Sequence, residues 1–315
     1  MTSQFTDAID PLTPPVTLAR AVYAIGNFDG VHRGHQAVIA RAIALARKLG
    51  VGAAALSFEP HPADFFARRS VVFRLTPRAA KAQALRALGL DGVVTLTFNA
   101  ALAGLSAEEF VAEVLVKRLD AGAVIVGWDF HFGKARAGTP EFLRAAGRRF
   151  GFGVEILDKV SIAAGAAISS TAVREALAAG DVKAAGGLLG RDYSVLGAVI
   201  AGQRLGRTLD TPTANIALEP GHKLAFGIYA ARVTVDGKSY GGVASFGVRP
   251  TVDHGAPLLE AHLFDFSGDL YGKTIEVAFV ARLRGEEKFA NLEALKEQMQ
   301  ADKARARAII FEAKA

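Results

Sequence analysis

The stretch GNFDGVHRGH, from Gly26 to His35, decides the fold of the first half of the chain because it joins a short apolar run to an amphipathic segment. The run Val22 to Ile25 is typical of a buried strand, and His35 to Leu49 carries its apolar residues on one helical stripe. Ligands of open α/β sheets lie beyond the carboxyl ends of the strands, where a helix N-terminus offers free N–H groups. His32 and His35 can donate hydrogen bonds to phosphate oxygens, whereas a glycine-rich turn with incidental histidines fits this position less well. The stretch predicts a phosphate-binding loop, in which close backbone approach is allowed by Gly26, Gly30 and Gly34.

The first half of the chain, up to about Asp158, alternates short apolar runs with helical stretches. This rhythm predicts an α/β domain in which parallel strands are joined by crossover helices. Ser106 with Glu109 is typical of a capping box, and Thr139 before Pro140 is typical of a helix start. Besides Val22 to Ile25, the expected strands are Ala53 to Phe58, Val93 to Phe98, Val124 to Gly127 and Val154 to Leu157.

The pattern changes after a short helix expected over Thr171 to Ala179, in the small-residue segment AAGGLLG from Ala184 to Gly190. We place the domain boundary there, which gives domains of residues 1–187 and 188–315. Closely spaced apolar runs and the hairpin signal Asp236-Gly237 predict antiparallel strands that close into a small barrel or sandwich. A final helix, capped by Asn291, is expected to bury Leu292, Leu295, Met299, Ala306 and Ile309. The expected strands are Tyr193 to Ile200, Gly227 to Val235, Lys238 to Phe246, Leu258 to Phe266 and Thr274 to Leu283.

The composition sets limits on the class of protein. The 315 residues suffice for two domains of roughly 150 residues each, with 51% apolar and 22% charged residues as in ordinary globular chains. No apolar run reaches the roughly 18 residues of a membrane span, and the N-terminus lacks an export signal. The absence of cysteine excludes disulfides, thiolate metal sites and cysteine nucleophiles, so we expect a cytoplasmic protein. The net charge of +6 is too diffuse to indicate nucleic-acid binding, so small molecules are the expected partners, and self-association stays open.

A second group of polar residues follows the boundary, in the stretch GQRLGRTLDTPTANI from Gly202 to Ile216. Thr213 and Asn215 carry neutral oxygens two residues apart, which points both to one side of an extended chain where Mg²⁺ or a phosphate could bind. Turn chemistry explains the same pair equally well. In the expected strand Leu258 to Phe266, Glu260 and His262 share the face opposite the apolar residues, and a solvated outer face is the simpler explanation. These residues alone leave the function of the second half open.

The HxGH pattern of the first loop resembles the nucleotidyltransferase superfamily, and the fuller stretch resembles the adenylylating half of the bifunctional riboflavin kinase/FAD synthetases. The same family is indicated by SFEPHPADFF (Ser57 to Phe66), VGWDFHFGKARAG (Val126 to Gly138) and ISSTAVR (Ile168 to Arg174). The resemblance implies a Rossmann-like domain that binds ATP through Gly26, Phe28, Asp29, His32, His35, Ser170, Thr171 and Arg174. It implies flavin binding through Pro60, Pro62, Phe66, Asp129 and Phe132.

Some of these positions keep another interpretation. Arg174 could be a solvated surface residue, and Phe66 and Phe132, taken alone, could simply pack in the core. His131 stands where the family frequently has arginine.

The second half resembles the riboflavin kinases through PTAN, GIYAARV, GVRPT (Gly247 to Thr251) and LEAHLFDFSGDLYGK (Leu259 to Lys273). The resemblance implies a small antiparallel β-barrel that ends in a long helix. It makes Glu260 the general base for the riboflavin 5′-hydroxyl, and it assigns ATP to Gly202 and Gly206 and Mg-ATP to Thr213 and Asn215. Arg249 and Arg284 are weaker candidates for phosphate or flavin contacts, with a surface role as the alternative. The sequence departs from the family at Asp210, Thr211 and Ser245.

The resemblance as a whole implies a bacterial-type enzyme with two activities. Riboflavin and ATP would give FMN and ADP in the barrel, and FMN and ATP would give FAD and pyrophosphate in the α/β domain, both with Mg²⁺. The alternatives are an FMN adenylyltransferase with a weakened kinase domain, and a flavin- or nucleotide-binding module without turnover. Retention of His32, His35 and Glu260 disfavours the module.

Overall fold

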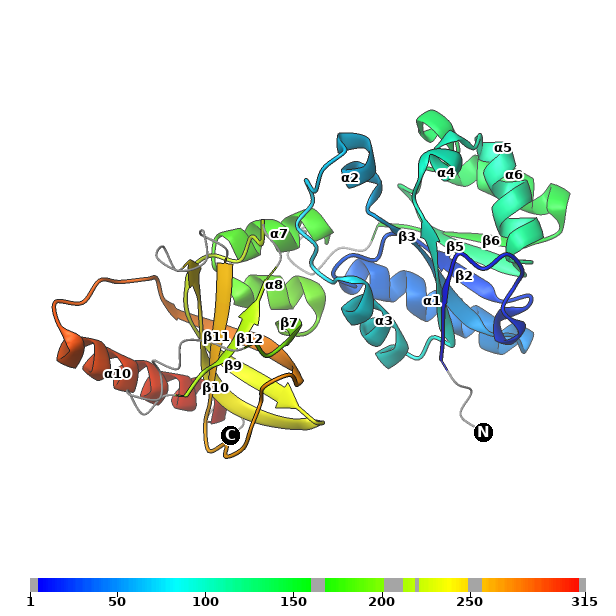
Figure 1. Ribbon diagram of the computed structural model, residues 1–315. Coiled ribbons are helices and arrows are strands. Elements are labelled where there is room, and N and C mark those ends of the chain that lie inside the picture. The colour runs from blue at the N-terminus through cyan, green and yellow to red at the C-terminus, as the bar shows by residue number, and fades with distance from the viewer. Residues whose placement is uncertain (1–4, 160–167, 201–211, 219–220, 249–256, 312–315) are drawn as a thin grey trace. The chain divides into compact units, whose positions relative to one another are not determined.

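The computed structural model describes residues 5–159, 168–200, 212–218, 221–248 and 257–311, and the chain forms two compact units, Met1–Ser170 and Thr171–Ala315. Each unit has its own sheet, parallel in the first and antiparallel in the second (Figure 1). The boundary expected between residues 187 and 188 falls within the helix Val182–Leu189, and it stays a prediction. Within the described ranges, no helix is both long and apolar enough to cross a membrane.

The first unit is built on a six-stranded sheet in the order β1-β4-β3-β2-β5-β6, in which every neighbouring pair is parallel. The strands expected from the sequence are confirmed, with small differences at their ends. The edge strand β1, which pairs with β4, is not predicted by the sequence. The strands are β1 (Thr6–Ile9), β2 (Val22–Ile25), β3 (Ala53–Glu59), β4 (Gly92–Thr97), β5 (Ala123–Gly127) and β6 (Gly153–Leu157).

Helices cover both faces of this sheet, as the uniformly apolar strands require (Figure 1). On one face, α1 and α3 pack on a core that includes Val22 and Ala24, and on the other, η2 and α6 pack on a core that includes Tyr23 and Ile25. Successive residues of β2 therefore serve opposite cores. The helices are η1 (Val16–Leu18), α1 (Arg33–Leu49), α2 (Pro62–Ala67), α3 (Arg78–Ala87), α4 (Ala100–Gly104), α5 (Ala107–Glu109), η2 (Phe110–Arg118), η3 (Lys134–Arg136) and α6 (Pro140–Phe150).

The direction of the chain across the sheet reverses at β2. From β2 the chain runs outward through β3 and β4 and then returns to β5, on the other side of β2. Such a switch point is where open α/β sheets bind ligands, beyond the carboxyl ends of the strands. The loops that leave β2 and β5 lie at this point, and they carry Gly26 to His32 and Trp128 to Gly133.

Several local signals in the sequence of the first unit are confirmed. Ser106 and Glu109 form the expected capping box, and the hydroxyl of Thr139 accepts a hydrogen bond from the N–H of Phe142 at 3.2 Å. Helix α1 ends at Gly50, which has a left-handed φ of 69°. Its apolar stripe is buried or half-buried except at the last turn, where Leu49 is exposed against expectation and is not among the residues of this core.

The second unit is a six-stranded antiparallel sheet in the order β7-β12-β9-β10-β11-β8. A bridge between Ile200 and Asn215 joins the two edge strands, with the N–H of Ile200 donating to the Asn215 carbonyl at 2.8 Å, so the sheet nearly closes into a barrel. The Asp236-Gly237 hairpin is confirmed, with left-handed φ values of 50° and 76°. The short strand β8 is not predicted by the sequence. The strands are β7 (Tyr193–Ala198), β8 (Ala214–Ala217), β9 (Gly227–Val235), β10 (Lys238–Val248), β11 (Pro257–Leu263) and β12 (Thr274–Arg284).

Two helices, α7 (Ser170–Ala178) and α8 (Val182–Leu189), precede the barrel. The segment AAGGLLG, which the sequence suggests as a break in pattern, lies within α8 and its cap. Asp181 caps this helix by accepting from the N–H of Ala184 at 2.9 Å, and Gly190 ends it with a φ of 74°. The apolar side of α8 is buried, which explains how a segment rich in glycine remains helical.

The final helix α10 (Leu292–Phe311) packs on the barrel as expected (Figure 1). Ala306 is buried as predicted, and Leu295, Met299 and Ile309 are half-buried. The Asn291 side chain accepts from the N–H of Ala294 at 2.9 Å, which confirms the cap. Leu292 is 55% exposed, so its predicted burial is wrong. The helix also buries Ile310 and the carboxylate of Asp302, and Asp302 meets a charged partner on the barrel.

That partner is Arg284 at the end of β12, which donates to both oxygens of Asp302 at 2.9 to 3.2 Å. Asp302 is only 5% exposed, so removal of its charge leaves the nearly buried guanidinium with the more distant and exposed carboxylate of Glu287, at 3.9 Å, as its counterion. We expect Asp302→Asn to lower the free energy of unfolding of this unit by about 3 kcal/mol. Urea unfolding followed by circular dichroism measures this change, with fluorescence of Trp128, the single tryptophan, reporting the first unit separately.

A matched control is Asp265→Asn, which removes the ion pair between Asp265 and Arg307 of the same helix. Both side chains of this pair are exposed. We expect little change from this control, because water screens exposed pairs. Equal effects of the two substitutions would contradict the role assigned to Asp302.

His222 makes the stability of the second unit depend on pH. Burial lowers its pKa from 6.5 to about 4, and its ring accepts from the N–H of Leu224 and lies 3.2 Å from the Tyr193 hydroxyl. The unfolded chain takes up a proton near pH 6.5, whereas the folded unit resists it. The contribution of neutral His222 to the free energy of unfolding is therefore fully present above pH 6.5. It falls by roughly 3 kcal/mol as the pH is lowered to about 4. We expect unfolding free energies to show this loss relative to His222→Asn, and parallel pH curves for the two proteins would contradict it.

Candidate active sites

The loop between β2 and α1 has an unusual backbone. Phe28, Gly30 and Val31 have left-handed φ values of 50°, 84° and 44°, of which only the glycine adopts such a conformation without strain. Phe28 and Val31 are buried, so packing holds them in place. The loop is a rigid turn at the carboxyl end of β2, as the predicted phosphate site requires.

His32 is the N-cap of α1. Its Nδ1 accepts a hydrogen bond from the backbone N–H of His35 at 3.2 Å, which places the proton of the neutral ring on Nε2. The two imidazole rings stack with their centroids 3.6 Å apart, and the edge of the Phe28 ring contacts His35. Gly34 leaves room for this arrangement, because a Cβ there would lie 3.2 Å from the His32 ring. The structure therefore brings the two predicted histidines together at one helix N-terminus.

His35 is a neutral ring at physiological pH. Burial, and secondly the charges of His32 and Lys81, hold the pKa of His35 well below its usual value of 6.5. Its Nδ1 atom is buried and has no hydrogen-bond partner among the residues that the structure describes. A neutral imidazole can still donate a hydrogen bond to phosphate, so the two histidines can stabilise charge without acting as a general acid or base.

Asp29 anchors the loop. Its carboxylate accepts hydrogen bonds from the N–H groups of Leu75 and Thr76 at 3.2 and 2.9 Å, and Thr76 Oγ1 in turn accepts from the N–H of Gly30 at 2.8 Å. The hydroxyl of Ser170 donates to the Asp29 carbonyl at 2.8 Å. Ser170 thus lies beside the loop, and its part in ATP binding stays a prediction. The Asp29 side chain is directed to the segment before α3.

The remaining predicted ATP residues differ in their placement. Gly26 follows β2 directly, and a Cβ there would contact the Phe28 ring at 3.4 Å. Thr171 and Arg174 lie on α7, in the second unit, so their part in the phosphate site stays a prediction.

The predicted flavin residues lie on the two neighbouring loops. Phe66 on α2 is 68% exposed and meets Phe65 and Phe98 edge-on, so the core-packing interpretation is wrong for this residue. Phe132 is buried among Phe110, Phe130 and Phe142, so packing accounts for it. Pro60 and Pro62 follow β3, with Pro62 in the first turn of α2.

After β5, Asp129 is exposed beside the exposed Trp128. The backbone carbonyl of Asp129 lies 2.9 Å from Nδ1 of His131. These two loops leave β3 and β5, the strands on either side of β2, so they flank the histidine loop.

A buried charged network next to the loop is not predicted from the sequence. The ammonium of Lys81 lies 2.9 Å from Glu59 and 3.2 Å from the Ser57 hydroxyl, and Arg74 lies 2.8 Å from the other oxygen of Glu59. One signal could have found it. Lys81 stands four residues before the buried Leu85, on the buried side of α3 where a lysine needs partners.

In the second unit, the register of the barrel brings the predicted kinase residues together. Asn215 on β8 pairs with Glu260 on β11, which pairs with Ser245 on β10. Directly opposed residues of antiparallel strands point to the same face, so these three side chains form one row. Asn215 is buried and Glu260 is half-buried, whereas Thr213 lies just before β8 and is half-buried. Gly202, Gly206 and Arg249, with Asp210 and Thr211, lie outside the described residues.

Arg284 is paired with Asp302, as described above, and its guanidinium also donates to the carbonyl of Gly285 at 3.1 Å. Its predicted contact with phosphate or flavin stays a prediction. His262, which shares the polar face of β11 with Glu260, lies with its Nδ1 3.0 Å from the Pro212 carbonyl.

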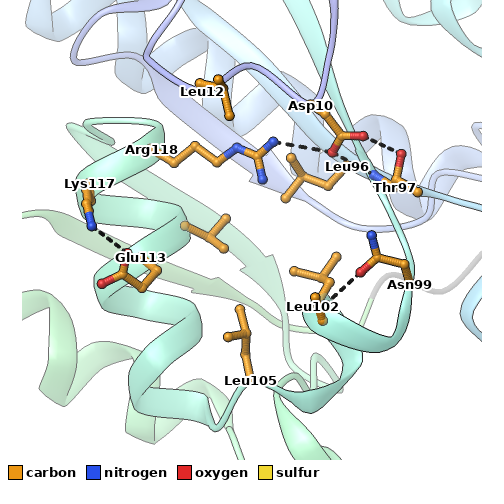
Figure 2. A pocket seen from close by; sticks show the side chains of 12 residues that line it. Asp10, Leu12, Leu96, Thr97, Asn99, Leu102, Leu105, Glu113, Lys117 and Arg118 are labelled. Atoms are coloured by element: carbon orange, nitrogen blue, oxygen red, sulfur yellow. Dashed lines mark hydrogen bonds and ion pairs between the residues drawn. The ribbon is translucent and has the colours of Figure 1, made fainter.

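A separate pocket of about 320 Å³ lies at the β1 edge of the first sheet (Figure 2). Asp10 accepts hydrogen bonds there from the N–H of Thr97 at 3.0 Å and from Arg118 at 3.3 Å, and Leu102 and Leu105 line the apolar side. None of its lining residues is a predicted site residue. The pocket is therefore distinct from the loop at the switch point.

Comparisons with known proteins agree for both units. The FAD synthetase family model matches residues 15–172, and the riboflavin kinase model matches residues 189–310. A bifunctional riboflavin kinase/FMN adenylyltransferase of Pseudomonas fluorescens is 47% identical over 289 residues, which cover 91% of this chain and 92% of the relative. Proteins of the same description from Haemophilus influenzae and Escherichia coli are 41% and 40% identical, covering 88% and 91% of this chain and 90% and 91% of their own lengths.

A solved structure from Streptococcus pneumoniae, described as a macrolide-efflux protein, is similar with a TM-score of 0.82 and 30% identity. The similarity covers 96% of this chain and 98% of that one. The FAD synthetase match covers the histidine loop, and the riboflavin kinase match covers the row of Asn215, Glu260 and Ser245. The chain belongs to the bifunctional riboflavin kinase/FMN adenylyltransferase family.

Proposed function

We propose that this chain phosphorylates riboflavin to FMN in the barrel and adenylylates FMN to FAD in the α/β unit. The observation that carries the proposal is the presence in one chain of the His32 loop, within the FAD synthetase match, and of Glu260, within the riboflavin kinase match. The product of the first reaction is the substrate of the second, so the two activities form a sequence.

In the adenylylation, an oxygen of the FMN phosphate attacks the α-phosphorus of ATP, and the bond from that phosphorus to the bridging oxygen breaks as pyrophosphate leaves. FMN phosphate is already a nucleophile, so the protein has to align the two substrates and neutralise charge. The Nε2–H group of His32 donates a hydrogen bond to a phosphate oxygen, because Nδ1 already accepts the hydrogen bond of the helix cap. His35 acts beside it as a neutral hydrogen-bonding group. Phe66 and Asp129, exposed on the flanking loops, support binding of the flavin there.

In the kinase reaction, the 5′-hydroxyl of riboflavin attacks the γ-phosphorus of ATP and ADP leaves. Glu260 accepts the proton of the hydroxyl, a role for which a half-buried carboxylate on the open polar face of β11 is suited. Asn215 and Thr213 would bind the ATP phosphates beside it. The pairing of Asn215 with Glu260 supports the placement of both substrates at one row of the ladder.

Mg²⁺ is expected with ATP at both sites, where it would neutralise phosphate charge. In the barrel, the neutral oxygens of Thr213 and Asn215 fit this hard cation, because Mg²⁺ prefers oxygen ligands and retains several waters. Asn215 is buried, and the pairing of β8 with β11 fixes the position of its backbone. The substrates and products are small molecules, and both reactions consume ATP; we infer a cytoplasmic location from that dependence.

Product analysis tests the proposed function. We expect the chain, incubated with riboflavin and Mg-ATP, to accumulate FAD, with FMN as an intermediate, resolved by chromatography. Conversion of added FMN but not of riboflavin would favour the adenylyltransferase alone. Ser245 opposite Glu260, where the family commonly has asparagine, would then be the first position to restore. Tight flavin binding without any product would contradict both activities.

Two variants separate the sites. Replacement of both His32 and His35 by alanine should lower FAD formation by at least about a hundredfold while FMN still accumulates from riboflavin. Glu260→Gln should do the opposite, stopping FMN formation while added FMN is still converted to FAD. Parallel loss of both products in folded variants, judged by circular dichroism, would count against independent sites.

A further inference from the structure

A buried cation lies beside the phosphate loop without touching the predicted substrate residues directly. Lys81 on α3 is only 3% exposed, and its ammonium lies 3.2 Å from the hydroxyl of Ser57 and 2.9 Å from the carboxylate of Glu59. Burial of a lysine is unfavourable unless its charge is paired and its donors are satisfied. An ordinary core position would hold an apolar residue here, so the retained charge requires an explanation.

In one direction the contacts of Lys81 lead to the phosphate loop. The ammonium has only donors, so Ser57 Oγ accepts from it and gives its own hydrogen to the carbonyl of Asn27 at 3.2 Å. In a trans peptide the carbonyl and the next N–H point in opposite directions, so this anchor turns the N–H of Phe28 away from β3. No acceptor for that N–H is found among the described residues. The relay therefore sets the orientation of a backbone donor within the loop.

In the other direction the contacts lead to the flavin-side helix. The second oxygen of Glu59 lies 2.8 Å from Arg74, and Arg74 lies 3.4 Å from the carboxylate of Asp64 on α2. Phe66 follows Asp64 by two residues on the same helix. Two cations and two carboxylates thus form a balanced network that joins α3, the end of β3 and α2.

We propose that Lys81 is a positioning residue for adenylyl transfer, which holds the phosphate loop through Ser57 and the flavin-side helix α2 through Glu59. The inference rests on the proposed function, because it deepens the role of the same site. Lys81 would align the two substrates without contacting either. The lowered pKa of His35, to which the Lys81 charge contributes after burial and His32, agrees with an ammonium placed close behind the histidine pair.

The test measures FAD formation from FMN and Mg-ATP by the full chain carrying Lys81→Met, Ser57→Ala or both. Misalignment should lower kcat by roughly 100-fold in Lys81→Met and about tenfold in Ser57→Ala, while the KM values for ATP and FMN change less than about threefold. Because Lys81 acts on the loop through Ser57, the double variant should be no slower than Lys81→Met alone. The control is Arg78→Met, on the same helix but in an exposed pair with Asp7, which should leave kcat unchanged.

Several results would overturn the inference. One is a kcat for Lys81→Met within threefold of the wild-type value. Another is a change in KM without a change in kcat. The third is that the effects of the two substitutions are fully additive in the double variant. If Lys81→Met does not fold, Ser57→Ala decides alone, since it removes one hydroxyl, and an unchanged kcat would overturn the relay. The wild-type chain in the same assay forms FAD if the proposed function holds, so a loss confined to the variants concerns Lys81, whereas absence of FAD in every sample overturns both proposals.

Discussion

The hydrogen bond from the backbone N–H of His35 to Nδ1 of His32 is the interaction on which the start of helix α1 depends. It begins α1 at the carboxyl end of β2, so the crossover to β3 and the stacked pair of rings both depend on it. Serine or aspartate could cap the helix equally well, but neither would leave a second nitrogen for a ligand. The His32 side chain therefore caps the helix through Nδ1 and can bind a ligand through Nε2.

The sequence of the first unit predicts its architecture well, because uniformly apolar strands and amphipathic helices carry strong local signals. The histidine loop could be predicted for the same reason. Strand β1 could not, since TDAI mixes polar and apolar residues and becomes a strand only by pairing with β4. The partners of Asp29 and Lys81 are equally hidden, because hydrogen bonds between Asp29 and Thr76 join residues 47 apart, and those of Lys81 reach 22 and 24 residues back along the chain.

In the second unit the hairpin, the long strands, the cap of α10 and the burial of Ala306 follow from local chemistry, whereas the burial of Asp302 does not. Asp302 is buried because it pairs with Arg284, a partner that the periodicity of the helix does not show. The polar face of Glu260 and His262 could be predicted from alternation. Its alignment with Asn215 could not, because β8 has four residues and acquires its register only from the barrel.

The ladder that aligns Asn215, Glu260 and Ser245 has a consequence for how active enzyme is recognised. A chain that closed its barrel with β11 displaced by one residue would turn the carboxylate of Glu260 toward the opposite side of the sheet, and with it the apolar residues that β11 now buries. Far-ultraviolet circular dichroism, which reports strand content, would detect little change in such a molecule, although it could not phosphorylate riboflavin. For this barrel, turnover of riboflavin is therefore also a readout of correct strand alignment, which secondary-structure content alone cannot supply.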